Sequence, residues 1–293
     1  EMVIRDWSSD VCSSDLLTIR ADDLGLSAVL RAQTINLYTG TPASRSMLIG
    51  AAAGGVFALT DAELGLLAGF SSLTIGEATQ QNASVTLRTV TSPVPAAAIV
   101  IYANNGAGGV VLDDEGSGTA LSTGGAGTIT IAAGTGSITA SSASNATAEL
   151  SSAGNISLSS QGSIGSALNR IQFSAGQTNV SVTNAPNGVW FDGLGALTLA
   201  VVTTNSTGAS GLDVTSGGLL TLSGAVATAT GNISFNPGAN GVTANSTING
   251  NSLTITNGGA VDLNNTITVP GGFSCAGTSF DNTGATITTT NNN

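Results

Sequence analysis

The chain has 293 residues, a formal net charge of −11 and no histidine, and only 8% of its residues are charged. This acidic balance, with six basic residues that are all arginines, argues against a nucleic-acid partner and against a basic patch on a membrane surface. The 40 glycines favour many tight turns, and a mean hydropathy of +0.31 favours a buried core over disorder.

The N-terminal end, residues 1–16, resembles the translation of a sequencing-library adapter, and we expect it to be a non-native segment outside the fold. Cys12 lies in this segment. The other cysteine, Cys275, falls on the inward phase of a strand-like unit, so a buried structural thiol is expected. Two cysteines this far apart predict neither a disulfide framework nor a metal-ligand spacing, and no cofactor is expected.

Residues 17–72 are predicted to form an irregular N-terminal segment that contains strands and one short helix. Leu17–Ile19 and Ile35–Tyr38 have the apolar alternation of strands. The stretch Met47–Phe57 is small and apolar, but Asp61 interrupts the apolar run soon afterwards. A membrane span needs about 20 apolar residues, so no membrane insertion is expected in this segment.

The short helix is expected near residues 60–69. Thr60 followed by Glu63 forms a capping box, in which each residue satisfies a backbone N–H near the other. Gly69 is placed to end the helix. Two interpretations stay open: a helix that covers or redirects the coil, and an ordinary helical turn within a loop.

Short apolar-x-apolar units recur from Leu73 onward, separated by Gly, Asn, Pro and Thr, which is the pattern of short strands ended by turns. Phe191, Leu212 and Ile233 follow one another at steps of about 21 residues, which predicts that they stack. The units are Leu73–Ile75, Val85–Leu87, Ile99–Ile101, Val110–Leu112, Ile129–Ile131, Ile156–Leu158, Ile171–Phe173, Val180–Val182, Val189–Phe191, Leu197–Leu199, Leu212–Val214, Leu220–Leu222 and Ile233–Phe235.

Three interleaved apolar series in the C-terminal part share a period of about 20 residues. A strand of three residues cannot bury a face alone, but it gains a hydrogen-bond ladder when it stacks on its equivalent in the next repeat. Three series with one period therefore predict one coil with three sides. The series are Ile233, Leu253, Phe273; Val242, Val261, Phe280; and Ile248, Ile267, Ile287.

The predicted fold is all-β: a right-handed, three-sided parallel β-helix over residues 73–293, with about 20 residues per coil and a truncated C-terminus. Roughly ten coils would give a rod of about 50 Å. Asparagines recur in the turns at the same spacing, Asn232 with Asn251 and Asn245 with Asn264. We expect these pairs to form side-chain ladders along the coil rather than a ligand site.

The chain resembles the filamentous haemagglutinin-like and autotransporter-type adhesin passengers of bacteria. Residues Leu59–Leu64, running into Leu73–Gly76, carry part of the resemblance. Units of the Gly-Asn-Ile-Ser and Leu-Thr-Ile-Thr-Asn-Gly type carry the rest, at Gly154–Ser157, Gly231–Ser234 and Leu253–Gly258. The resemblance covers residues 59–293 and implies a very large secreted or surface-anchored protein with a β-helical shaft.

Few residues qualify for a chemical role. Asp262 and Asp281 are one period apart, so they are expected to stack as an acidic pair that could bind Ca²⁺ or act as acid and base; exposed structural aspartates are the alternative. The same spacing argument pairs Asp192 with Asp213 on earlier coils. Trp190 should point outward, as a residue that contacts carbohydrate or protein, or as one packed under a loop.

The segment Asp113–Glu115 is a compact acidic turn. It has two interpretations, a weak Ca²⁺ site and a solvated turn. The solvated turn is favoured, because the segment lacks the ligand spacing of known calcium-binding loops.

We therefore expect a non-enzymatic structural shaft of a large bacterial adhesin, secreted or at the cell surface. Its partners would be a host-cell, matrix or carbohydrate surface and the remainder of the same large chain. Two alternatives stay open. One is a carbohydrate-active β-helix enzyme, a polysaccharide lyase or hydrolase, and the other is an extracellular matrix component without a receptor.

Overall fold

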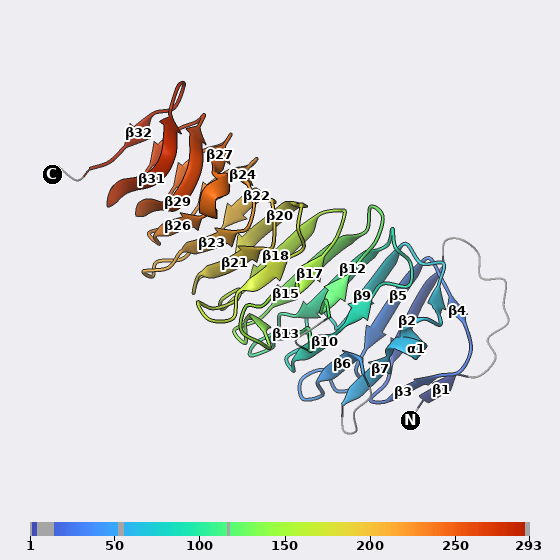
Figure 1. Ribbon diagram of the computed structural model, residues 1–293. Helices are drawn as coiled ribbons and strands as arrows, with labels where there is room; N and C mark the ends of the chain where they lie inside the picture. The colour runs from blue at the N-terminus through green and yellow to red at the C-terminus, as the bar shows by residue number, and fades with distance from the viewer. Residues whose placement is uncertain (1, 5–14, 52–55, 116–117, 291–293) are drawn as a thin grey trace.

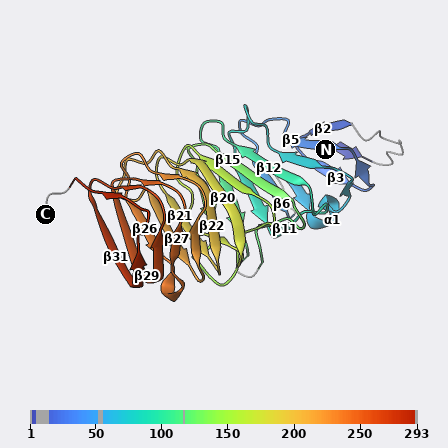
Figure 2. The ribbon, with the colours of Figure 1, turned by 90° about the horizontal axis from the view of Figure 1, so that it is seen from above.

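The computed structural model describes residues 2–4, 15–51, 56–115 and 118–290. The chain winds into a long rod in which the colours of Figure 1 follow sequence order, with the two termini at opposite ends. Figure 2, turned by 90°, shows the same progression of strands. All pairings between the named strands are parallel. The predicted all-β parallel β-helix is confirmed.

One ladder of strands runs from the N-terminal end to the middle of the rod and then continues as two. Its first part contains β2 (Leu16–Arg20), β5 (Thr34–Tyr38), β9 (Ser72–Ile75), β12 (Ala98–Ala103), β15 (Thr128–Ala133), β18 (Ile156–Ser160), β20 (Gln177–Asn184) and β22 (Leu197–Thr203). Beyond β22, one branch contains β24 (Leu220–Leu222) and β27 (Val242–Ala244), and the other contains β25 (Val226–Ala227), β28 (Ile248–Asn249), β30 (Ile267–Thr268) and β32 (Ile287–Thr288).

Two further ladders form the remaining sides and merge in the middle of the rod. The first contains β7 (Phe57–Thr60), β6 (Met47–Gly50), β10 (Val85–Arg88), β13 (Val110–Asp113) and β16 (Ile138–Ala140). The second contains β11 (Val90–Thr91), β14 (Leu121–Ser122), β17 (Leu150–Ser151) and β19 (Ile171–Phe173). Both reach β21 (Val189–Gly193), which is followed by β23 (Leu212–Ser216), β26 (Ile233–Asn236), β29 (Ser252–Leu263) and β31 (Gly272–Asp281).

The N-terminal end adds two short pairs of strands. Strand β1 (Met2–Ile4) pairs with β3 (Leu24–Leu26), and β4 (Leu30–Arg31) pairs with β8 (Leu67–Ala68). Leu16 opens β2, while Cys12 and most of the adapter-like segment lie outside the described residues. The adapter origin of residues 1–16 stays a prediction.

The C-terminal coils have the register that the apolar series predicted. Each series forms one column because each member pairs with its equivalent in the next coil. The pairs are Ile233 with Leu253 and Leu253 with Phe273, Val242 with Val261 and Val261 with Phe280, and Ile248 with Ile267 and Ile267 with Ile287. These coils are the three-sided unit expected from the sequence.

The period of about 20 residues holds in some earlier coils, such as the one that pairs Ile171 with Phe191, but not in all of them. Ile99 pairs with Ile129, and Ile129 pairs with Ile156, so those coils are considerably longer. The expected stacking of Phe191 on Leu212 is also wrong, because Leu212 pairs with Val189. In both cases additional turn residues lengthen the coil without changing the inward phase of the strands.

The predicted capping box is present at the short helix α1 (Asp61–Leu64). The backbone N–H of Glu63 donates to Thr60 Oγ1 at 3.3 Å, and the backbone N–H of Thr60 donates to Glu63 Oε2 at 2.9 Å. The expected end of the helix is wrong, because Gly65 is the C-cap and Gly69 follows β8. The chain leaves the helix early, since Leu67 pairs with Leu30 in a strand. One short 3₁₀ turn, η1 (Gly238–Asn240), follows β26.

The core is a continuous column of inward apolar side chains. Strand β12 alternates buried and half-buried positions, so that Ile99 and Ile101 point inward. Cys275 has the expected phase, pairing with Ile255, but it is only partly buried and not the fully buried thiol that was predicted. Its strand, β31, has a long neighbour on one side only, so its inward residues are less covered; this partial burial still raises the pKa of the Cys275 thiol.

The predicted asparagine ladders are confirmed. Asn264 Nδ2 donates to Asn245 Oδ1 at 3.1 Å, and Asn251 Nδ2 donates to Asn232 Oδ1 at 2.7 Å. These amides satisfy one another across successive turns, so they serve the stacking of the coils. Within the described residues, no helix is both long and apolar enough to cross a membrane.

Candidate functional site

The outward surface of β21 and β23 carries Trp190, the aromatic residue singled out from the sequence. Trp190 is half-buried, and its cross-strand neighbour on the next coil is Asp213. The Trp190 ring lies over the backbone at Gly188, where an added Cβ atom would come within 3.0 Å of the ring carbon Cη2. The side chain therefore points outward as expected, with part of its ring packed on the backbone just before β21.

Asp192 and Asp213 do not pair with each other, contrary to expectation. Asp192 is the cross-strand partner of Thr215 and Gln172, and Asp213 is the partner of Trp190. The cause is the register of β21 on β23, which differs by two residues from the one that a 21-residue step predicts. Their carboxylates therefore serve different networks.

Asp213 forms an ion pair with Arg170, whose side chain reaches across three coils. Arg170 Nη2 donates to Asp213 Oδ2 at 2.9 Å, while Nη1 donates to the carbonyl oxygens of Phe191 and Asp213, both at 3.2 Å. The side chain of Arg170 is only 15% exposed. A guanidinium with five donors can tie neighbouring coils together in this way, whereas an ammonium presents a point charge.

Replacing Arg170 by alanine is expected to lower the free energy of unfolding by about 2 kcal/mol, because a partly buried carboxylate and two carbonyls lose their donor. The matched control is Arg20→Ala. Arg20 pairs with Glu77 at 2.6 Å but its side chain is 40% exposed, so that loss should stay below about 1 kcal/mol. Urea unfolding followed by circular dichroism measures both. Equal losses would contradict the role assigned to Arg170.

The acidic turn Asp113–Glu115 is neither a converging cation site nor a wholly solvated turn. Arg88 Nε lies 2.8 Å from Asp113 Oδ2 and 3.4 Å from Glu115 Oε1. Asp114 instead is only 1% exposed, and its carboxylate binds Ser142 and Asn145. The middle carboxylate therefore has different partners from its two neighbours, and the three do not converge on one point.

Asp114 belongs to a buried polar network that spans several coils. Asp114 accepts hydrogen bonds from Ser142 Oγ at 3.0 Å and from Asn145 Nδ2 at 2.8 Å. The backbone N–H and C=O of Asn145 are both bound by the side-chain amide of Gln172, each at 2.7 Å. Gln172 Nε2 also donates to Asp192 Oδ2 at 3.0 Å. The network joins β13, the loop 141–148, β19 and β21.

Glu149 lies inside this network and is fully buried. Its Oε2 accepts the backbone N–H of Gln172 at 2.5 Å, and its Oε1 has no hydrogen-bond partner. The pKa of the Glu149 carboxyl is raised to about 7, mainly by burial; the backbone N–H groups of Gln172 and of Glu149 itself lower it, and the nearby carboxylates of Asp114 and Asp192 raise it. The Glu149 carboxyl therefore stays protonated in the folded chain up to about neutral pH.

Sequence reasoning missed Glu149 and Gln172. Gln172 stands between Ile171 and Phe173 in an apolar-x-apolar unit, which predicts an outward position, yet all three residues are buried. The outward side is covered by the loop 141–148, whose path the periodicity does not specify. The one sign of this buried site in the sequence was the position of Glu149, an acidic residue directly before the strand β17.

The predicted acidic pair is in register, since Asp262 is the cross-strand partner of Asp281. Asp262 Oδ2 accepts Asn264 Nδ2 at 3.1 Å, and Asp281 Oδ1 accepts the backbone N–H of Thr283 at 2.8 Å. Side-chain and backbone hydrogen bonds from Thr283 lower the pKa of Asp281. A lowered pKa keeps the Asp281 carboxylate ionised, which suits a side chain that accepts the N–H groups of its own turn. A general acid would need a raised pKa in order to hold a proton.

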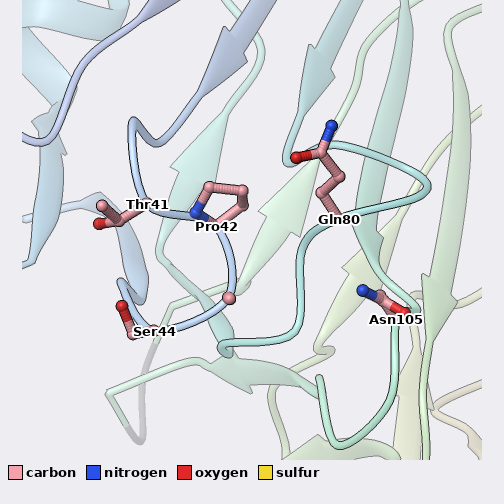
Figure 3. A pocket seen from close by; sticks show the side chains of 6 residues that line it. Thr41, Pro42, Ser44, Gln80 and Asn105 are labelled. Atoms are coloured by element: carbon pink, nitrogen blue, oxygen red, sulfur yellow. The ribbon is translucent and has the colours of Figure 1, made fainter.

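Two of the surface hollows lined by described residues lie on the N-terminal half of the rod. The larger, about 430 Å³, lies between three loops, with Thr41, Pro42 and Ser44 on one, Gln80 on the second and Asn105 on the third (Figure 3). It offers neutral hydroxyl and amide groups. The other, about 320 Å³, has Asp61 as its one carboxylate, lined otherwise by Gly65, Thr89, Thr91, Ser92 and Pro93. Glycoside hydrolysis requires two carboxylates, which neither hollow supplies.

Within the part of the chain that the structure describes, no group of three or more His, Cys, Asp or Glu side chains is placed to hold a metal ion. Comparison with known proteins finds no matching family model, no similar curated protein and no similar solved structure.

Proposed function

We propose that this chain is a segment of the structural shaft of a large bacterial adhesin, secreted or exposed at the cell surface, with a host-cell, matrix or carbohydrate surface as its partner. The observation that carries the proposal is the unbroken parallel ladder from β2 to β32. Hydrogen bonds between coils run along the rod axis, so bending the rod strains many of them together. Such a rod suits the display of outward residues at a distance from an anchor.

The side chains on the outside of the rod support the display of contact residues rather than the catalytic turnover of a substrate. Asparagine ladders and the Arg170 contacts tie successive coils together. Trp190 offers a half-buried ring beside Asp213, and an aromatic ring next to a carboxylate fits the apolar face and the hydroxyls of a sugar. It is the best candidate for a contact residue.

A carbohydrate-active enzyme is the second candidate, favoured by one observation: Asp262 and Asp281 lie side by side on adjacent coils. A matrix component without a receptor is the third, and it shares the rod with the first. The three differ in what the chain does to a surface. A shaft with contact residues adheres, an enzyme cleaves, and a matrix component does neither.

The test uses beads coated with the chain on host cells, on matrix proteins and on a panel of polysaccharides. The adhesin proposal predicts adhesion above that of beads coated with an unrelated protein, reduced by Trp190→Ala and unchanged by Asp262→Asn. Release of sugar fragments that is lost in Asp262→Asn or Asp281→Asn would overturn it in favour of an enzyme. Absence of adhesion on every surface would favour the matrix component.

A further inference from the structure

The loop 141–148 is attached to the rod almost entirely by polar contacts. Most of its residues are exposed or half-buried. Two backbone bonds hold it, from Ser141 N–H to the carbonyl of Leu112 and from Ser144 N–H to the carbonyl of Leu168. Its other contacts include Ser142 and Asn145, which bind Asp114, and the backbone of Asn145, which is bound by Gln172. A segment with little apolar burial opens at low free energy compared with the core. The part of its attachment that runs through Asp114 and Gln172 is sensitive to the charge state of the carboxyls beneath it.

The groups beneath the loop are three carboxyls whose hydrogen bonds in this network come from neutral donors. Glu149 ends the loop, Asp114 follows β13 and Asp192 lies on β21. The arginines on the neighbouring strands form ion pairs with other carboxylates: Arg170 with Asp213 at 2.9 Å, and Arg88 with Asp113 at 2.8 Å.

Each aspartate of this group has hydroxyl and amide donors. Asp192 Oδ1 accepts Thr215 Oγ1 at 2.7 Å, and Asp114 accepts Ser142 and Asn145. Glu149 Oε2 accepts the backbone N–H of Gln172, but its buried Oε1 has no hydrogen-bond partner. Among the three carboxyls, Glu149 is the one for which the neutral form suits the folded site best.

We propose that Glu149 is a pH-sensitive switch for the loop 141–148: a proton on its carboxyl keeps the loop closed on the rod, and loss of that proton opens the loop. An ionised Glu149 would be a buried anion beside two other carboxylates. Opening of the loop that ends at Glu149 admits water to Oε1 and relieves this repulsion. This inference does not depend on the adhesin proposal.

The direction follows from the raised pKa of about 7 in the closed state, against 4.5 for the free group. The closed state binds the proton more tightly, so closure is fully favoured below pH 4.5, weakens as pH rises through the window from 4.5 to 7, and changes little above it. Between pH 5 and pH 8 the ratio of open to closed loop should rise on the order of 50-fold.

Hydrogen exchange of the backbone amides of Asn145 and Gln172 tests the switch, because both donate within this network. After correction for the intrinsic rate, protection in the wild type should fall by tens of fold from pH 5 to pH 8. In Glu149→Gln it should stay flat, since the amide oxygen still accepts the Gln172 N–H and carries no charge. Asp262→Asn, an unrelated carboxylate, should keep the wild-type dependence.

Equal protection at both pH values in the wild type would overturn the proposal, as would an unchanged pH dependence in Glu149→Gln. If that variant does not fold, the wild type labelled with ¹³C at its five glutamate carboxyl carbons decides the question. One resonance should titrate with a midpoint near 7. Titration of every glutamate below about pH 6 would refute the switch.

Discussion

Replacing Phe191 by alanine is expected to lower the free energy of unfolding by about 3–5 kcal/mol, the largest effect that we expect from a single substitution in this chain. Phe191 is fully buried and meets Phe173 of the preceding coil edge to face, with ring centroids 4.9 Å apart and planes at 89°. Its removal leaves a cavity in mid-rod, where the coils on both sides stack on the affected one. Such aromatic pairs also contribute about 1 kcal/mol beyond the buried area.

The control for this substitution is Phe280→Ala. Phe280 occupies the same inward phase near the end of the rod but is 46% exposed, so its loss should cost about 1 kcal/mol or less. Urea unfolding followed by circular dichroism compares the two variants. Similar losses for Phe191→Ala and Phe280→Ala would mean that the middle of the rod is no better packed than its end, and would contradict the core described above.

Replacing Gly76 by alanine is expected to destabilise the rod by at least about 3 kcal/mol. Gly76 follows β9 with φ of +80°, and a Cβ atom there would lie 2.0 Å from the carbonyl oxygen of Tyr102 in the next coil. Its N–H donates to the carbonyl of Leu37 in the preceding coil at 3.0 Å. The residue is therefore held between two coils, and neither backbone can move away without breaking the ladder.

Gly69 provides a matched control, because it has a similar φ of +73° with no heavy atom within 4 Å of the added Cβ. Gly69→Ala carries only the backbone cost of a left-handed alanine, about 1 kcal/mol. The difference in thermal or urea stability between the two variants measures the contact between coils. A Gly76→Ala variant no less stable than Gly69→Ala would show that the coils are not packed as closely as described.

The fold was largely predictable from the sequence, and the C-terminal coils were predictable to the residue. A coil that repeats with nearly constant length places each inward residue on its equivalent, so the spacing of Ile248, Ile267 and Ile287 fixes the register by itself. The capping box of Thr60 and Glu63 and the asparagine ladders were predictable for a related reason, since each depends on a local or one-period spacing.

The earlier coils were less predictable because their turns vary in length. An inserted turn residue changes the period but not the alternation within a strand. The strand units Ile99–Ile101 and Ile129–Ile131 were therefore found, while the coil length between them was not. The same effect paired Leu212 with Val189 instead of Phe191, and so separated Asp192 from Asp213.

What the sequence determined by itself is the alternation and period that make a parallel β-helix, because these follow from side-chain polarity along one strand and one repeat. What only the tertiary structure decided is which outward positions remain exposed. The loop 141–148 folds over β19 and turns Gln172 and Glu149 into buried groups, whereas Trp190 on the next strand stays half-exposed. Burial of an outward residue depends on a loop from another coil, and no pattern within the strand encodes it.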